Sequence, residues 1–225
     1  KLGKGALILI IALAVAAYWL MSTDTGRQTQ FLIGGAFVNL GYRMQDHLEV
    51  YDFDDHHDVS PEEIWDIVRH HNSLASSVRD WFPRTSRHPL VALVACMDQR
   101  IDTAELTGDT RMYYYVIRTA GSILSEREQE MLELAVANGV KLILLTTHTD
   151  CAAEGAAASP ESRALYPAMT QGVDNRENRF REFLERPVIA KRVANGELLI
   201  KEVLVDSKTR KMKPLSYTPS SRSGT

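Results

Sequence analysis

The chain has 225 residues, of which 44% are hydrophobic and 24% are charged, so a wholly disordered protein is excluded. The net charge of −3 argues against a nucleic-acid binder that works through a basic patch. Two cysteines are too few for a disulfide-rich secreted scaffold. A length in this range, at about 100–200 residues per domain, predicts one sizeable domain or one domain with an appendage.

The first predicted element is an apolar helix. Residues 6–21 read ALILIIALAVAAYWLM, without a charge or a strong polar group. A membrane-spanning helix needs about 20 apolar residues, with a lower limit near 17. Tyr18 and Trp19 lie at the end of the segment, where aromatic side chains favour the headgroup region. We therefore predict a single-pass transmembrane anchor over residues 1–21.

Lys1 and Lys4 flank this segment and favour a cytoplasmic N-terminus. The main domain is then expected on the non-cytoplasmic side of the membrane. A cleavable signal peptide is an alternative, although the sequence LMSTDTG offers no good A-x-A cleavage site. A buried core helix is a further alternative, weakened by the lack of a polar face.

Residues 22–59 are predicted to form a juxtamembrane linker that contains an apolar patch. Ser22–Gln30 is polar, whereas Phe31–Leu40 (FLIGGAFVNL) is apolar but too short to span a membrane. The Gly34-Gly35 pair argues against a regular helix, because glycine destabilises helix interiors. We expect the patch to pack on the domain, with contact to a membrane or a partner subunit as the alternative.

The folded domain is predicted over residues 60–217, followed by a flexible tail over residues 218–225. Its first helix begins with Ser60 as N-cap and Pro61 at the first helical position, and extends to about Trp81.

Strands and helices then alternate. Leu90–Ala95 and Leu142–Leu145 are continuous apolar runs, as expected of strands buried on both faces. Met112–Ile117 is rich in aromatic and β-branched residues and predicts another strand. A helix is predicted over Ser125–Asn138, with a capping box of Ser125 and Glu128 at its start.

The C-terminal third is predicted to be helical first and extended later. Asn175–Leu184 has the clearest helical spacing, and a short helix continues to Val193. Residues 198–205 suggest a strand, and Met212–Tyr217 is expected to pair back on it as a hairpin. Together these elements predict an α/β fold with a mostly parallel central sheet flanked by helices, plus one N-terminal transmembrane helix.

Both cysteines directly follow a predicted buried strand. Cys96 opens the sequence CMDQR, and Cys151 closes the sequence HTDC, which begins with His148. Ligand sites in open α/β sheets form at the carboxyl ends of the strands, so these three side chains can meet. Two thiolates and one imidazole suit zinc, with a fourth position open to water or substrate.

Asp98 and Arg100 extend this pattern. The arginine can hold the carboxylate ionised and oriented through a charge-assisted pair. A carboxylate fixed in this way can accept a hydrogen bond from a zinc-bound water and help to remove its proton. If the pair breaks, the carboxylate can instead move onto the zinc and close the site.

The motifs C-x-D-x-R and H-x-x-C resemble those of the β-class carbonic anhydrases, and of the shorter bacterial and archaeal branch in particular. Val116–Gly121 (VIRTAG) also resembles the family's V-I-R-N-A-G stretch, with Thr119 in place of Asn. The resemblance covers about residues 89–215. Ala152 departs from the family pattern, which usually has Gly after the second cysteine.

The resemblance implies that Cys96, His148 and Cys151 bind Zn²⁺ and that Asp98 and Arg100 form a catalytic dyad. The implied reaction interconverts CO2 and bicarbonate by attack of zinc-bound hydroxide. It also implies a homodimer in which the N-terminal helices embrace the neighbouring subunit.

Three alternatives stay open. In the first, the domain is a subunit of a larger membrane complex with a structural or vestigial zinc site. In the second, it is a hydrolase for another small heterocumulene such as COS or CS2. A cysteine hydrolase that uses Cys96 and His148 would leave Cys151 and Arg100 unexplained. A phosphatase-type C-x5-R loop is excluded, because the sixth residue after Cys96 is Asp102.

Overall fold

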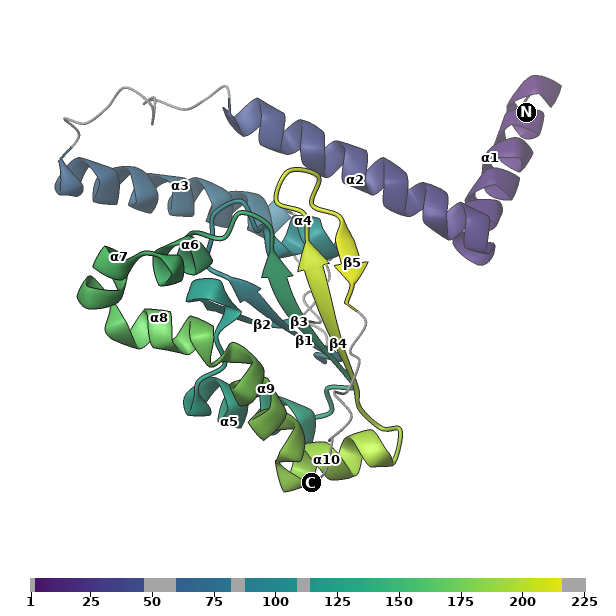
Figure 1. The fold of residues 1–225 in the computed structure, drawn as a ribbon. Coiled ribbons are helices and arrows are strands. Elements are labelled where there is room, and N and C mark those ends of the chain that lie inside the picture. Colours follow the sequence, from purple (N-terminus) through teal and green to yellow (C-terminus); the bar gives the residue numbers. More distant parts are fainter. Residues whose placement is uncertain (1–2, 47–59, 82–87, 109–113, 216–225) are drawn as a thin grey trace. The chain divides into compact units, whose positions relative to one another are not determined.

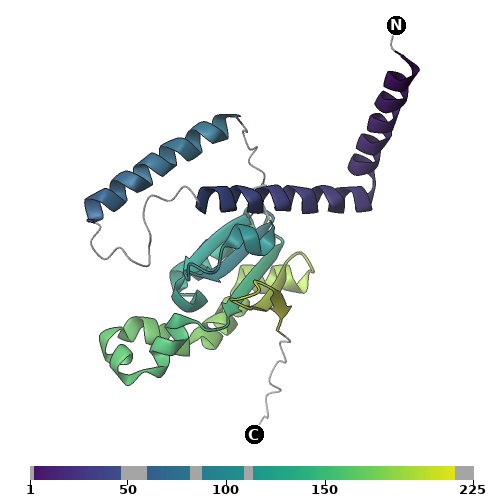
Figure 2. The same cartoon turned by 90° about the horizontal axis from the view of Figure 1, so that it is seen from above.

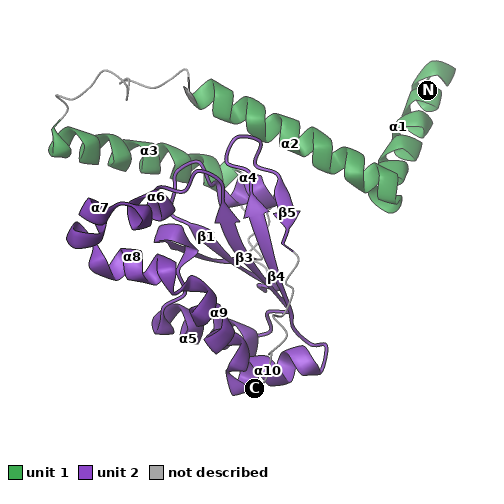
Figure 3. Cartoon of the chain, in the orientation of Figure 1, with its two compact units in different colours: residues 1–81 green, residues 82–225 purple. Residues whose placement is uncertain are grey.

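The structure is a computed structural model that describes residues 3–46, 60–81, 88–108 and 114–215. The predicted tail over residues 218–225 and the first two residues of the strand predicted from Met112 lie outside the described residues. The chain divides into two compact units, residues 1–81 and residues 82–225 (Figure 3).

The first helix of unit 1, α1, spans Lys4–Ser22 (Figure 1). Its residues from Ala6 to Met21 carry no charge. None of its residues is buried, and by length and composition it can cross a membrane. Nineteen residues at about 1.5 Å each give roughly 28 Å, close to the hydrocarbon thickness of a bilayer. The helix therefore coincides with the predicted anchor.

The second helix, α2, spans Asp24–Asp46 and overturns the prediction of an irregular linker. It runs without a break through Gly34 and Gly35, which have no neighbouring atom within 4 Å of an added Cβ. Each glycine costs a helix about 0.5–1 kcal/mol relative to alanine. That cost is local, and a helix of 23 residues has enough other hydrogen-bonded turns to continue through it.

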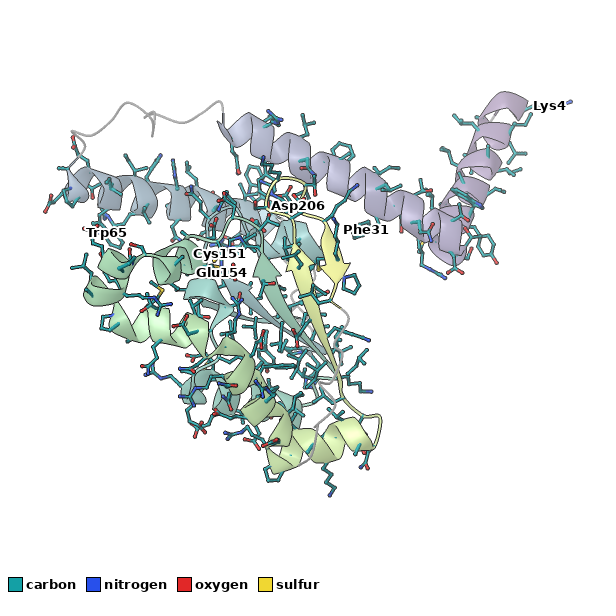
Figure 4. The ribbon with its side chains drawn as sticks, viewed as in Figure 1. Lys4, Phe31, Trp65, Cys151, Glu154 and Asp206 are labelled. Atoms are coloured by element: carbon teal, nitrogen blue, oxygen red, sulfur yellow. The ribbon has the colours of Figure 1, made fainter. Side chains whose placement is uncertain are left out.

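The third helix, α3, spans Pro61–Trp81 and begins where the sequence predicts. The Ser60 hydroxyl accepts a hydrogen bond from the Glu63 backbone N–H, and the Glu63 carboxylate accepts one from the Ser60 N–H. This reciprocal pair is a capping box, which satisfies N–H groups that the first helical turn leaves free. Its apolar side chains are exposed within unit 1, including Trp65, which Figure 4 labels.

Unit 2 is built on a five-stranded sheet with the strand order β2-β1-β3-β4-β5 (Figure 1). The first four strands in this order are parallel, and the short β5 pairs antiparallel with β4, as the predicted hairpin requires. The mostly parallel α/β sheet is confirmed. The strands are β1 (Val91–Cys96), β2 (Tyr114–Thr119), β3 (Leu142–His148), β4 (Leu199–Val205) and β5 (Met212–Pro214).

Helices connect these strands. The capping box of Ser125 and Glu128 at the start of α5 is confirmed. A short helix, α4, was not predicted; Asp102 caps it by accepting a hydrogen bond from the Glu105 N–H. The helical segments of unit 2 are α4 (Thr103–Thr107), the 3-10 turn η1 (Ala120–Ser122), α5 (Glu126–Ala137), α6 (Ala152–Ala158), α7 (Pro160–Leu165), α8 (Pro167–Asp174), α9 (Arg176–Glu185) and α10 (Pro187–Ala194).

The main core lies between one face of the sheet and helices α5, α9 and α10 (Figure 2). Ala92 and Val94 of β1 point into it, and Phe183 of α9 and Ile189 of α10 are fully buried there. The alternate residues Leu93 and Ala95 belong to a smaller cluster on the other face. All six residues of β1 are buried, so this strand is a rigid base for the loop that follows it.

Candidate metal centre

Three potential metal ligands meet at the carboxyl ends of two neighbouring strands. Cys96 is the last residue of β1 and His148 the last residue of β3, and these strands pair in parallel. Cys151 follows three residues later and precedes the first residue of α6, where Figure 4 shows it near Glu154. The sheet topology thus brings together residues that lie up to 55 positions apart in the sequence.

The ligand atoms of Cys96, His148 and Cys151 all lie within 4.8 Å of one another. Two ligands of a tetrahedral zinc, each about 2.0–2.3 Å from the metal, lie roughly 3.5 Å apart. The three residues are only 4%, 4% and 7% exposed, respectively. Their spacing and burial therefore fit a shielded metal site that closes by a small inward movement of the side chains.

The histidine is oriented as a metal ligand. Its Nδ1 lies 3.0 Å from the backbone carbonyl oxygen of Thr149, which can only accept a hydrogen bond. Nδ1 therefore carries the proton, and the lone pair is on Nε2. Nε2 is buried and has no hydrogen-bond partner among the residues that the structure describes. A buried acceptor without a partner is costly, and a metal ion at this point would satisfy it.

The two sulfur atoms have different surroundings. The Gly121 backbone N–H donates a hydrogen bond to Cys96 Sγ over 3.3 Å. Burial raises the pKa of the Cys151 thiol. A cation between the two sulfur atoms would offset the cost of burying this second negative charge.

Asp98 and Arg100 lie next to this group and contact each other side-on. Arg100 Nε donates to Asp98 Oδ1 over 3.0 Å, and Nη2 donates to Oδ2 over 2.8 Å. The Arg100 backbone N–H also donates to Oδ1, over 2.9 Å. These hydrogen bonds hold the pKa of Asp98 well below its usual range, so the carboxylate stays ionised. Asp98 faces Arg100 with both oxygens rather than joining the three metal ligands.

With this geometry in place, comparison with known proteins is decisive. The family model for carbonic anhydrase matches residues 91–184, which include all five of these residues. This part of the chain is therefore similar to the carbonic anhydrases. No curated protein matches the chain.

Solved structures show that this part of the chain has the fold of the β-carbonic anhydrases. Carbonic anhydrase from Streptococcus mutans is 20% identical, with a TM-score of 0.51, and the match covers 66% of this chain and 97% of that one. A tetrameric β-carbonic anhydrase from Sordaria macrospora is also 20% identical, with a TM-score of 0.54 and coverage of 69% and 98%. A β-carbonic anhydrase of Aspergillus fumigatus is 14% identical, with a TM-score of 0.54 and coverage of 70% and 93%.

Two further residues of unit 2, to which the sequence assigned no role, contact Arg100 or the loop that carries it. Arg118 of β2 donates to the backbone carbonyl oxygens of Cys96 and Asp98, over 3.2 and 2.7 Å. Arg100 Nη1 donates to Asp150 Oδ2 over 2.7 Å, and Nη2 donates to the Asp150 carbonyl oxygen over 2.8 Å. Arg118 thus fixes the loop after β1, and Arg100 joins that loop to the one after β3.

The segment that departs from the family pattern keeps its shape. The Thr119 hydroxyl donates to the Ile123 carbonyl oxygen over 2.9 Å, which closes the turn around Gly121. Gly121 has φ = +61°, a conformation that favours glycine. Its N–H reaches Cys96 from this turn, so replacing the family's Asn by Thr119 leaves the donor to the sulfur in place.

A cavity of about 400 Å³ is lined by residues of β3, β4 and α9. Thr147 and Ser122 border it and adjoin His148 and Gly121 in the sequence. Glu202 also lines the cavity; burial and, secondarily, the charge of Glu177 raise the pKa of its carboxyl.

Proposed function

We propose that this chain is a membrane-tethered zinc carbonic anhydrase that interconverts CO2 and bicarbonate. One observation carries the proposal: in the part of the chain that is similar to the carbonic anhydrases, two buried cysteines and the unpartnered Nε2 of His148 converge within 4.8 Å. Cys96, His148 and Cys151 would hold the zinc. Once bound, zinc supplies Lewis acidity that lowers the pKa of a water molecule and so provides a nucleophile for CO2.

The side chains of the protein orient the reacting water and guide its proton. Asp98 presents an ionised carboxylate that accepts a hydrogen bond from the reacting water and orients its oxygen toward CO2. Arg100 keeps this carboxylate in one orientation and keeps it charged. When CO2 and water combine to bicarbonate, one proton is released, and Asp98 is placed to guide it from the water toward solvent. Asp98 is 11% exposed and Arg100 39%, so the dyad lies between the buried ligands and the outside.

The tether would be α1, which is long and apolar enough to cross a membrane. The lysines at its start support a cytoplasmic N-terminus and a catalytic domain on the other side. For the assembly, we propose a homodimer. The exposed apolar residues Ile64, Val68 and Leu74 of α3, and Tyr115 and Val116 on the edge strand β2, would be covered by a second copy. The Sordaria macrospora proteins are described as tetrameric, so the mass in solution should be measured to distinguish a dimer from a pair of dimers.

The experiment combines stopped-flow CO2 hydration with zinc analysis on the same sample of the detergent-solubilised chain. We expect zinc-dependent turnover in the parent and loss of both zinc and turnover in Cys96→Ser. Asp98→Asn is the matched control: it should retain zinc and lose most turnover. A folded, zinc-loaded parent without turnover at neutral or alkaline pH would overturn the enzymatic proposal and favour a structural subunit of a larger membrane complex. Light scattering on the same sample reports the oligomer.

A further inference from the structure

The two N-terminal helices meet at a bend (Figure 2). Thr23 separates them in an extended conformation, with φ = −99° and ψ = 151°. Its hydroxyl donates to the Trp19 carbonyl oxygen over 2.8 Å and accepts from the Gly26 N–H over 2.9 Å. One side chain thus caps the end of α1 and the start of α2.

Gly26 defines which face of α2 is turned toward α1. It is buried, and a Cβ added to it would lie 2.2 Å from the Trp19 carbonyl oxygen and 2.7 Å from Leu20 Cα. Real Cβ atoms do not approach backbone atoms so closely, so only glycine allows this contact. The face of α2 that contains Gly26 is therefore the inner face of the bend.

The same face continues along α2 as a stripe of large apolar side chains. At about 100° per residue, Ile33, Phe37, Leu40 and Met44 all lie within about 40° of Gly26 around the helix axis. The charged residues Asp24, Arg27 and Arg43 lie about 100° or more away from Gly26 on the same scale. Phe37 and Met44 are 69% and 62% exposed.

From these observations we infer that α2 lies along the membrane surface with the stripe Ile33–Phe37–Leu40–Met44 inserted among the lipids. The inference rests on the proposed tether: if α1 crosses the bilayer, the inner face of the bend is the face toward the bilayer. Trp19 and Tyr18 place the end of α1 in the headgroup region. Ile33, the first residue of the stripe, lies seven residues or about 10 Å along the helix from Gly26. The stripe therefore lies beyond the end of α1, where lipid rather than α1 would face it. α2 then holds the chain that leads to the catalytic domain parallel to the membrane rather than away from it.

The helix itself offers a matched control. Phe31 is the same residue type on the same helix and is similarly exposed, at 59%, but lies about 140° from Gly26 (labelled in Figure 4). We would reconstitute the full chain in phosphatidylcholine vesicles and compare Phe37→Trp with Phe31→Trp. The readout is the quenching of tryptophan emission by brominated phosphatidylcholine. The emission of the unsubstituted chain is subtracted, so that only the introduced tryptophan is compared. Because interfacial helices bury their apolar face about 5–10 Å deep, we expect at least about twofold more quenching at position 37 than at position 31.

Alkaline carbonate extraction of the same vesicles tests the anchor separately. A chain that resists extraction and shows the stronger quenching at position 37 supports the inference. A chain that resists extraction but shows equal quenching, or more at position 31, overturns the inference and leaves the tether standing. A chain that carbonate extracts overturns the tether, and the inference with it. Gly26→Ala, which cannot keep the contact with Trp19, should reduce the difference between the two positions.

Discussion

Arg100 makes two kinds of contact, and replacing Arg100 and Asp150 separately tests which contact matters for turnover. Its guanidinium donates twice to Asp98, whose side chain is 11% exposed, and once to the carboxylate of Asp150, which is 81% exposed. Arg100→Lys keeps the positive charge but cannot bind a carboxylate side-on through two N–H groups. Asp150→Asn leaves the side-on contact intact, and asparagine tolerates the left-handed φ of +59° at this position.

The structure gives the expected magnitudes. Two charge-assisted hydrogen bonds contribute about 1.5–3 kcal/mol each when shielded, but Arg100 is 39% exposed, which reduces their combined effect to about 2 kcal/mol. If Asp98 must be oriented in the transition state, Arg100→Lys should lower kcat/KM for CO2 hydration about 30-fold. The pair with Asp150 is exposed and screened by solvent, so Asp150→Asn should lower kcat/KM by less than about fivefold.

The assay is stopped-flow hydration with a pH indicator, with zinc content and circular dichroism measured on each variant. Zinc content should be unchanged in both variants, because neither residue belongs to the three ligands. A loss of similar size in the two variants would refute the assignment of orientation to the Asp98 contact. It would indicate instead that Arg100 acts mainly by joining the loops after β1 and β3.

Three further predictions concern the frame around the site. Gly121→Ala should weaken zinc binding about tenfold or more in a chelator competition. Alanine is strained at φ = +61°, and its Cβ would lie 3.3 Å from the side chains of Ala153 and Val173. Both effects would displace the Gly121 N–H that donates to Cys96. Phe183→Ala should lower the free energy of unfolding by about 3–5 kcal/mol in a denaturant titration, because the ring is fully buried in the main core. Glu202→Gln should raise the unfolding temperature at about pH 8, because the raised pKa of Glu202 means that the folded chain disfavours the ionised carboxyl. This penalty disappears below the ordinary pKa of 4.5, so the variant should show no gain in unfolding temperature there.

The position of the metal centre could be predicted from the sequence because it depends on strong local signals. The buried runs that became β1 and β3 place Cys96 and His148 at strand ends, and a parallel sheet brings such ends to one edge. The spacing H-x-x-C adds Cys151 without further assumptions. For the same reason Asp98 and Arg100 could be placed beside the ligands, since a loop of four residues cannot carry them far from Cys96.

The sequence did not indicate which groups brace this site. Arg118 contacts the loop after β1 across 20 to 22 positions, and Arg100 contacts Asp150 across 50. Such contacts depend on strand order and on left-handed backbone at Asp150, which no local pattern of residue types specifies. The helix α2 was missed for the opposite reason. The Gly34-Gly35 pair is a local signal against a helix, but its cost is small compared with the hydrogen-bonded turns on either side of it.

These contacts explain how a carboxylate can lie next to the proposed zinc site without joining it. The loop from Cys96 to Arg100 is held from β2 by Arg118, through the carbonyl oxygens of Cys96 and Asp98, and from the β3 loop through Asp150. With its backbone fixed on two sides and both carboxylate oxygens bound by Arg100, Asp98 can move onto the metal only by breaking several hydrogen bonds at once. The fourth position on the metal would thus be left to water, as hydration of CO2 requires.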